Sequence, residues 1–235
     1  MRASGSDTGL VRAVASADPI QASGVAAVSG AAGTIGRAVV SKLVERGLVV
    51  LALDRDESAL ANLAKQREGW VLPVPGELPS PEALAALKEA LEQVGMLHHA
   101  VAIAGGATPG ELGKDTASLD VASFRSIIEA NLVSTWAFVH ACLPWMAKSA
   151  GDRSITFCSS HNALAGRGLP AYSAAKAGLH GLLHPLAVEL GAHGVRVNAV
   201  APGQEEDVAA AFAALALDLQ GVTGQTIVVD AGAHI

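Results

Sequence analysis

The feature that most constrains the fold is a regular alternation of short apolar runs and longer helical patterns. Seven runs rich in Val, Ile, Leu and Ala are typical of strands, and a stretch with helical periodicity separates each from the next. The strands are predicted at residues 24–30, 48–54, 70–75, 98–106, 153–160, 195–202 and 224–230. The helices are predicted at residues 34–47, 57–68, 80–95, 118–148, 171–194 and 205–219. Strands that are apolar throughout and joined by amphipathic crossovers indicate a parallel sheet covered on both faces.

This pattern predicts one α/β domain with a doubly wound, Rossmann-type sheet of about seven strands, flanked by helices on both faces. The length of 235 residues suits a single domain with a sizeable core. Residues 1–22 are rich in Ser, Asp, Gly and Pro, and we expect a flexible tail there, with the domain at 23–235. In such sheets ligands lie beyond the carboxyl ends of the strands, so the chemistry is sought after each strand.

Composition narrows the class of partner. The formal net charge is -6 and there is no basic block, which argues against nucleic acid. We find no run of about 18 apolar residues that would span a membrane, and no signal-peptide pattern. Cys142 and Cys158 lack metal or redox spacing and are interpreted as small buried hydrophobes in a reducing cytoplasm. His98 and His99 have no metal partners at recognisable spacing, so no metal is predicted.

A glycine-rich turn follows the first predicted strand. The stretch "SGAAGTIG", Ser29 to Gly36, leads from that strand into the first helix. Glycines 30, 33 and 36 allow a tight turn and close approach of the backbone to a pyrophosphate, and the helix N-terminus offers free N–H groups to the anion. A turn of this kind in this place predicts a dinucleotide site that includes Thr34 and Ile35.

An acidic residue ends the second predicted strand. Asp54 lies about 20 residues past the glycines, where a carboxylate can accept hydrogen bonds from the adenosine ribose. It would repel a 2′-phosphate, which favours NAD over NADP. Arg55 follows directly and weakens that preference.

The stretch "PAYSAAKAG" contains the only tyrosine of the chain. Tyr172 and Lys176 are spaced i, i+4, so a helix would present both on one face. A nearby ammonium favours the phenolate, and lowering a phenol pKa from about 10 to about 7 takes roughly 4 kcal/mol. Ser159 and Ser160 end the preceding strand, where either could hold a substrate oxygen beside the tyrosine. The combination predicts a proton-transfer set.

Together these motifs resemble the short-chain dehydrogenase/reductase family, in its Tyr-x-x-x-Lys subgroup, over residues 24–235. "SGAAGTIG" is similar to a TGxxGxxG variant of the family's cofactor loop, "VRVNAVAPG" to its strand before a Pro-Gly turn, and "TGQTIVVDAG" to its closing strand. The resemblance implies an NAD(P)-dependent oxidoreductase that acts on a small alcohol or carbonyl compound. It also implies a homotetramer or homodimer, built partly from the long helices at 120–148 and 171–191.

The resemblance further implies individual roles. Tyr172 matches the acid/base, Lys176 the residue that binds the nicotinamide ribose, and Asn131 the helix asparagine that orders a relay water. Ser159 has the usual spacing to the tyrosine, whereas Ser160 matches the second serine of the motif, and we favour Ser160 as catalytic. The remaining carried-over positions are Glu77 near adenine, Ala104 and Gly105 at the fourth strand end, Pro202 and Gly203 after the sixth strand, and His161 near substrate.

Two departures from the family pattern stand out. The usual Asn-Asn-Ala-Gly is "AIAG" at residues 102–105, so hydrogen bonds normally given by two amides must be made otherwise or lost. After Pro202-Gly203 the chain passes almost directly into the last predicted helix. The helical flap that folds over the substrate is therefore expected to be absent, together with its threonine, and the site to be open or covered by another chain.

Three functions remain open at this stage. The favoured one is the NAD(P)-dependent oxidoreductase. A second is a nucleotide-binding protein without redox turnover, such as a sensor or a degenerate partner subunit, suggested by the missing flap and the "AIAG" segment. A third, a non-redox enzyme such as a dehalogenase on the same scaffold, is disfavoured because that group lacks the lysine and the glycine-rich loop.

Overall fold

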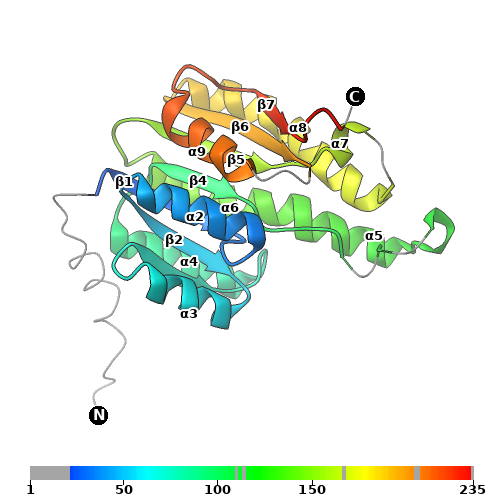
Figure 1. Cartoon of the computed structure of the whole chain (residues 1–235), viewed down its shortest axis with the longest axis horizontal. Helices are drawn as coiled ribbons and strands as arrows, with labels where there is room; N and C mark the ends of the chain where they lie inside the picture. Colours follow the sequence, from blue (N-terminus) through cyan, green and yellow to red (C-terminus); the bar gives the residue numbers. More distant parts are fainter. Residues whose placement is uncertain (1–21, 109–110, 113–114, 166–167, 204–206, 234–235) are drawn as a thin grey trace, which may run out of the picture.

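The computed structural model describes residues 22–108, 111–112, 115–165, 168–203 and 207–233. The predicted tail at 1–22 therefore lies, apart from Ala22, outside the described residues. Seven strands form one sheet in the order β3-β2-β1-β4-β5-β6-β7, and every neighbouring pair is parallel. This confirms the doubly wound α/β fold (Figure 1).

All seven strands lie within the predicted runs, and five of them are shorter than predicted. They are β1 Gly24–Ser29, β2 Leu48–Asp54, β3 Val71–Pro75, β4 His99–Ala102, β5 Arg153–Cys158, β6 Val195–Pro202 and β7 Thr226–Val229. The fourth was predicted to continue to residue 106. It ends at Ala102 because the backbone beyond turns away through Gly105 at φ 129° and Gly106 at φ 157°, conformations that favour glycine.

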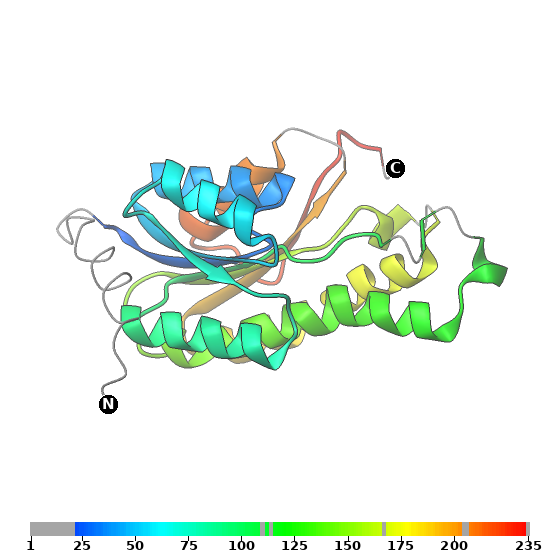
Figure 2. The same cartoon turned by 90° about the horizontal axis from the view of Figure 1, so that it is seen from below.

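The helices cover both faces of the sheet (Figure 2). One face carries α2 Thr34–Glu45, α3 Glu57–Gln66 and α9 Val208–Ala213, which continues as the π-helix η3 Ala214–Asp218. The other carries α4 Pro81–Val94, α5 Val121–Ile128, α6 Ser134–Met146 and α8 Pro170–Gly191. Two short elements, the 3₁₀-helix η1 Thr116–Ser118 and α7 Asn162–Ala165, lie in the loops near the carboxyl edge.

The long helix predicted at 118–148 is one continuous helical stretch with an irregular centre. Between α5 and α6 the π-helix η2 Glu129–Val133 adds one residue to the turn. Asp120 caps the N-terminus of α5, and the Asp120 side chain accepts a hydrogen bond from the N–H of Ser123. By length and composition the stretch Val121–Met146 could cross a membrane, but 44% of its most apolar 18-residue window is buried inside the protein. A long core helix passes the same criterion.

Each face of the sheet has its own apolar core. One cluster joins the strands to α4, α6 and α8 through residues such as Leu87, Phe138 and Leu183. The other joins them to α2, α3 and α9 through Val39, Leu60 and Phe212. All six residues are at most 1% exposed, so both faces of the sheet are excluded from water, as the uninterrupted apolar strands required. The polar ends of the strands are thereby left as the place for chemistry.

The amino end of β4 carries the two histidines that were predicted to be structural. His98 Nδ1 accepts a hydrogen bond from the N–H of Val25 at 3.1 Å. His99 Nδ1 lies 2.9 Å from the hydroxyl of Ser154, and burial lowers the His99 pKa to about 4. Both rings tie neighbouring strands together, which confirms the structural interpretation. Within the described part of the chain, no group of three His, Cys, Asp or Glu side chains could hold a metal ion.

Candidate active site

A cavity of about 780 Å³ lies at the carboxyl edge of the sheet, between the glycine turn and the start of α8. Most of the cofactor residues predicted from the sequence line it. They are Gly30, Gly33, Thr34, Ile35, Gly36, Asp54, Arg55, Glu77, Ala104, Gly105, Tyr172 and Lys176. The ends of five strands, β1 to β5, contribute to this cavity, which lies at the switch point of the doubly wound sheet, between β1 and β4.

The turn after β1 depends on two of its glycines. Gly30 has φ 69°, and a Cβ there would lie 2.8 Å from the backbone nitrogen of Ala104. A Cβ at Gly36 would overlap the carbonyl oxygen of Gly30. The helix α2 begins at Thr34, and its N-cap Gly33 supplies no side-chain hydrogen bond. The N–H groups of the first turn are therefore left to bind an anion, which suits a pyrophosphate.

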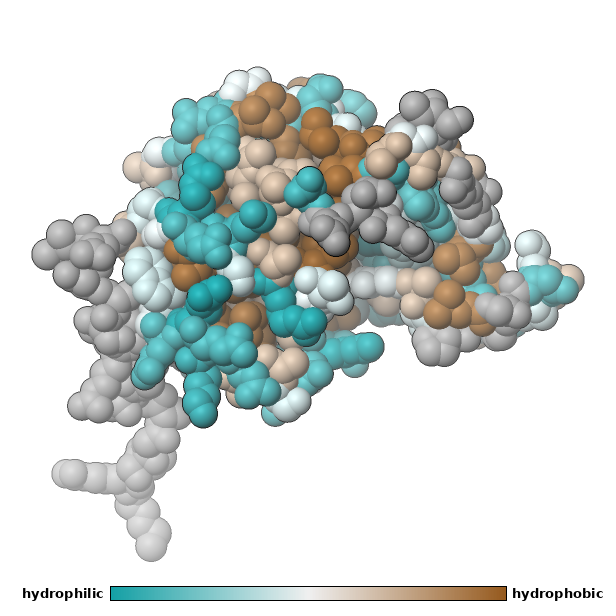
Figure 3. All heavy atoms as spheres, in the orientation of Figure 1, coloured by the Kyte–Doolittle hydropathy of each residue, from teal (hydrophilic) through white to brown (hydrophobic). Residues whose placement is uncertain are grey.

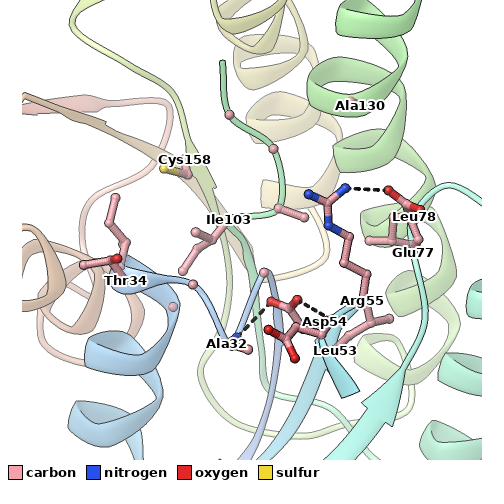
Figure 4. Close-up of a pocket in the computed structure, with 18 of the residues that line it drawn as sticks. Ala32, Thr34, Leu53, Asp54, Arg55, Glu77, Leu78, Ile103, Ala130 and Cys158 are labelled. Atoms are coloured by element: carbon pink, nitrogen blue, oxygen red, sulfur yellow. Dashed lines mark hydrogen bonds and ion pairs between the residues drawn. The ribbon is translucent and has the colours of Figure 1, made fainter. Parts of the chain in front are cut away.

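The charged residues at the ends of β2 and β3 form two separate contacts (Figure 4). Asp54 Oδ2 accepts a hydrogen bond from the N–H of Ala32 at 2.9 Å, so this carboxylate is held against the glycine turn. The guanidinium of Arg55 pairs instead with Glu77, with Nη1 and Oε1 2.8 Å apart. Arg55 and Glu77 are both largely exposed. The one arginine next to Asp54 in the sequence thus already has a carboxylate partner.

Tyr172 and Lys176 reach the same cavity from the first turns of α8. Lys176 is 2% exposed, and its Nζ donates to the carbonyl oxygen of Cys158 at 2.8 Å. The Nζ lies 5.6 Å from the centre of the Tyr172 ring. The spacing read from the sequence therefore places both side chains on one face of the helix, beside the end of β5.

The titration behaviour of this pair follows from its burial. Burial raises the pKa of the Tyr172 phenol above its ordinary value, and a hydrogen bond with the Ser160 side chain acts in the opposite direction. Burial also lowers the pKa of the Lys176 ammonium. In the protein without a bound cofactor the phenol is therefore protonated at neutral pH. A positive charge brought close to it is needed to change that.

The two serines after β5 have different surroundings. Ser160 interacts with the Tyr172 side chain, and its hydroxyl accepts a hydrogen bond from the N–H of Asn162 at 3.2 Å. The Ser159 hydroxyl lies 2.7 Å from Nε2 of His180 and 3.3 Å from the carbonyl oxygen of Lys176. Ser160 is thus beside the phenol, whereas Ser159 is engaged underneath α8.

Asn131 lies in the π-helix η2 and is fully buried. Its Oδ1 accepts a hydrogen bond from the N–H of Gly106 at 2.8 Å, and its Nδ2 donates to the carbonyl oxygens of Gly106 and Ile127. Both amide hydrogens are used, so the side chain holds the loop after β4 to the helix. π-Helical turns are frequent at functional sites, and here the turn brings Asn131 to the cavity edge next to Ala130, which lines it.

The loop after β4 compensates for the missing asparagines of the "AIAG" segment. The hydroxyl of Ser29 accepts hydrogen bonds from the N–H groups of Ile103 at 3.2 Å and Ala104 at 3.3 Å. Together with the Asn131 amide, this hydroxyl holds the backbone that lines the cavity. Ser29 itself is 1% exposed and does not line the cavity. Its role in this structure is to support the loop.

The end of β6 lies outside the lining of this cavity. Pro202 accepts a hydrogen bond from the N–H of His161 at 3.1 Å, and Gly203 N–H donates to Val229 at 2.7 Å. The Nδ1 of His161 is 4.0 Å from Asp230 and has no hydrogen-bond partner among the described residues. Only residues 203–207 separate β6 from α9, of which 204–206 lie outside the described part. No long flap follows this strand.

Some residues that line the cavity were not predicted from the sequence. Cys158, directly before the serines, lines the cavity, and burial raises its thiol pKa. Its position at a strand end could have revealed it. Both cysteines are free and buried, as predicted. Leu78, Ile103 and Thr108 also line the cavity but come from loops whose course no local pattern predicts.

Comparisons with known proteins show the family of the chain. The sequence matches the short chain dehydrogenase family over residues 24–211. It is 32% identical over 180 residues to L-fucose dehydrogenase of Mus musculus, a match that covers 76% of this chain and 64% of that protein. It is 35% identical over 182 residues to cis-4-hydroxycyclohexanecarboxylate dehydrogenase of Sinomonas cyclohexanicum, with 76% and 72% covered. The chain thus spans less than two thirds of the length of the mouse relative.

A solved structure shows the same architecture. An oxidoreductase of the short chain dehydrogenase/reductase family from Burkholderia thailandensis aligns with a TM-score of 0.79 at 34% identity. The alignment covers 88% of this chain and 91% of that one. The parallel sheet, the glycine turn and the Tyr172–Lys176 pair are thus accompanied by a family match over most of the sequence. The protein belongs to the short-chain dehydrogenase family.

Proposed function

We propose that the protein is an NAD(P)-dependent oxidoreductase that interconverts an alcohol and a ketone or aldehyde, with Tyr172 as acid/base. The observation that carries this proposal is that Tyr172 and Lys176 line the same cavity as the glycine turn after β1. The cradle formed by Gly30 and Gly36, which a Cβ would fill, fits a dinucleotide. When bound, the nicotinamide ring supplies or accepts the hydride.

The residues of the chain have distinct roles in this proposal. Tyr172 gives its hydroxyl proton to the carbonyl oxygen of the substrate during reduction and takes it from the alcohol during oxidation. Ser160 holds that oxygen beside the phenol, which its interaction with the Tyr172 side chain supports. Lys176 binds the nicotinamide ribose and favours the phenolate. Bringing the phenol pKa from about 10 to about 7 requires roughly 4 kcal/mol, which this cation shares with an oxidised nicotinamide ring.

The role of Asn131 in this proposal is broader than the water-ordering role that the family resemblance implies. Because both of its amide hydrogens are used by backbone carbonyls, its side chain supports the loop at Gly106 and contributes to catalysis by positioning. In this proposal a relay water binds to Oδ1 of Asn131, which accepts one hydrogen bond from the N–H of Gly106 and has a second lone pair.

We propose NAD as the preferred cofactor. Asp54 is held toward the glycine turn, where its charge repels a 2′-phosphate. Arg55, the cation that would attract this phosphate, is paired with Glu77. In this proposal the Asp54 carboxylate faces the adenosine ribose, and the arginine next to it in the sequence already has a carboxylate partner.

The substrate is an alcohol or carbonyl compound that reaches Tyr172 through an open site. The short connection of residues 203–207 supports this openness, because a flap of a few dozen residues has no room there. Two relatives are named as dehydrogenases of L-fucose and of cis-4-hydroxycyclohexanecarboxylate, and both names support an alcohol substrate. His161, next to Ser160, is the proposed further contact to substrate.

We also propose a homo-oligomer, a dimer or tetramer in the cytoplasm. Five of the ten exposed large apolar side chains among the described residues lie on the long helices, namely Val121, Phe124, Val133 and Trp136 on α5, η2 and α6, and Val188 on α8. The projecting end of α5 shows as an apolar patch in Figure 3. Burial of such a surface against a second copy would be favourable. Two free cysteines agree with a reducing compartment.

The open site also supports a second candidate, a nucleotide-binding protein without turnover. One experiment separates the two. The protein is titrated with NADH and NADPH by fluorescence, and a panel of alcohols and ketones is then followed at 340 nm. The oxidoreductase proposal predicts tighter binding of NADH and turnover of at least one compound. Binding without turnover across a broad panel would favour the sensor, and much tighter NADPH binding would overturn the assignment of NAD.

A further inference from the structure

The helix that carries Tyr172, α8, begins with N–H groups that its own N-cap residue does not satisfy. The first N–H groups of a helix have no intrahelical partner. In α8 the N-cap Leu169 gives no side-chain hydrogen bond and adopts φ 53°, ψ 64°. Pro170 has no N–H, and the N–H of Ser173 donates to Leu169 at 2.8 Å. The N–H groups of Ala171 and Tyr172 are thus the two donors that need an acceptor from elsewhere.

Glu111, from the loop after β4, supplies that acceptor. Its Oε1 accepts a hydrogen bond from the N–H of Ala171 at 2.7 Å, and its Oε2 accepts one from the N–H of Tyr172 at 3.1 Å. Glu111 is 1% exposed. A buried carboxylate is costly unless it is hydrogen-bonded, and the positive end of a helix dipole is a favourable place for its charge. The contact therefore joins a charged group to the two donors nearest the phenol.

The same loop forms one wall of the cofactor cavity. Gly105, Gly106, Ala107 and Thr108 line it. The carbonyl oxygen of Thr108 accepts hydrogen bonds from the N–H groups of Glu111 and Leu112, both at 3.0 Å. These two hydrogen bonds therefore connect the cavity wall at Thr108 with the residue whose carboxylate caps α8. The roles given above to Tyr172, Lys176 and Ser160 do not include this group.

We propose that Glu111 is a positioning residue that fixes the first turn of α8 against the loop after β4 and so sets the place of the Tyr172 phenol beside Ser160. This inference rests on the proposed function, because it assumes that Tyr172 transfers the proton. A phenol displaced by about 1 Å can lose on the order of 100-fold in rate. Glu111 acts through Tyr172 and touches no reacting atom.

The test compares Glu111→Ala and Glu111→Gln with a matched control, Ser80→Ala. The Ser80 hydroxyl caps α4 by accepting a hydrogen bond from the N–H of Ala83, also before a proline in the first turn. Glu111→Ala and Ser80→Ala lose the capping side chain and Glu111→Gln loses one of two acceptor oxygens, so all three variants should melt at a lower temperature. We expect kcat to fall about 30- to 100-fold in Glu111→Ala and about fivefold in Glu111→Gln, which keeps one acceptor oxygen. The Kd for NADH should change by less than about threefold, because the glycine cradle is unaltered.

A second readout does not depend on turnover. Tyr172 is the only tyrosine of the chain, so the phenolate absorbance at 295 nm reports its titration alone. The groups around it are Lys176 on α8, Cys158 and Ser160 at the end of β5, and Glu111 on the loop. Removal of the Glu111 charge and loss of burial both favour the phenolate, so the midpoint should fall by about half a pH unit or more in Glu111→Ala and stay in place in Ser80→Ala.

The two readouts separate this inference from the proposed function. If the wild type turns over and Glu111→Ala keeps kcat within about twofold of Ser80→Ala, the positioning role is overturned. If the wild type shows no turnover with any compound, the proposed function fails, and the titration alone decides. A lowered midpoint then supports the contact between Glu111 and the start of α8 as a constraint on Tyr172, and an unchanged midpoint overturns it.

Discussion

The two halves of the carboxyl edge differ in how completely the chain builds them. On the side of β1, β2 and β4, the glycine turn, Asp54 and the loop after β4 are held by backbone contacts and by the buried side chains of Ser29 and Asn131. On the side of β6 and β7, only residues 203–207 follow the strand, and the cavity lining does not reach Pro202 or Gly203. In the proposed function, the first side binds the cofactor through many internal contacts, and the second leaves the approach of the substrate uncovered. Cofactor binding and proton transfer can therefore be tested at named residues, whereas the substrate has to be found by screening compounds.

The largest expected effect is the loss of cofactor binding when the glycine turn after β1 is altered. In Gly36→Ala the new Cβ would overlap the carbonyl oxygen of Gly30, so the turn must move away from the pyrophosphate position. We expect the Kd for NADH to rise by about 1,000-fold or binding to vanish. Gly181→Ala is the control, because a Cβ there meets nothing within 4 Å. Unchanged NADH binding in a folded Gly36→Ala protein would contradict the assignment of this turn.

The next effect, a loss of kcat, distinguishes the two serines that follow β5, between the two sides of the carboxyl edge. Ser160→Ala should lower kcat about 100-fold, since it removes the hydroxyl that holds the substrate oxygen next to Tyr172. Ser159→Ala should lower kcat less than about fivefold, and should lower thermal stability because His180 loses a partner at 2.7 Å. Steady-state kinetics and melting curves measure both. The reverse order of the two kcat losses would assign catalysis to Ser159.

The pH midpoint of the Tyr172 titration tests whether a bound cofactor lies next to the phenol. Burial raises the pKa of Tyr172 in the free protein, so its phenolate appears only at high pH. Saturating NAD⁺ places a positive ring near the phenol and should lower the 295 nm midpoint by about two pH units. Alcohol oxidation, which needs the phenolate, should accordingly rise about tenfold per pH unit below the new midpoint. A midpoint that NAD⁺ leaves unchanged would mean that the cofactor and Tyr172 do not meet.

The smallest effect concerns cofactor choice. Glu77→Gln leaves Arg55 without its partner at 2.8 Å, so the guanidinium becomes available to a 2′-phosphate. The Kd for NADPH should fall about fivefold while that for NADH changes little, as expected for an exposed ion pair. Glu89→Gln, an exposed acid farther along α4, removes the same charge away from the cavity. An equal effect of both variants would show that only net charge matters.

The sequence predicted those parts that local patterns determine. The positions of the strands and the parallel, doubly wound class follow from apolar runs and crossovers, whereas the order of the strands comes from the structure. The glycine turn, Asp54 and the i, i+4 pair of Tyr172 and Lys176 have fixed spacings. What it could not predict depends on contacts between distant segments. Glu111 lies 60 residues from its partner Ala171, and no pattern marks it. The ending of β4 at Ala102 and the engagement of both Asn131 amide hydrogens likewise arise only when the loop packs on η2.

The central claim is that Tyr172 transfers the proton in a cavity that binds the cofactor independently of its hydroxyl. Tyr172→Phe keeps the ring and removes only the hydroxyl. The most direct measurement is the turnover of this variant at 340 nm on a compound that the wild type converts, together with its Kd for NADH. We predict a loss of about 1,000-fold in kcat with a Kd within about threefold of the wild type. Turnover within a few-fold of the wild type would contradict the mechanism.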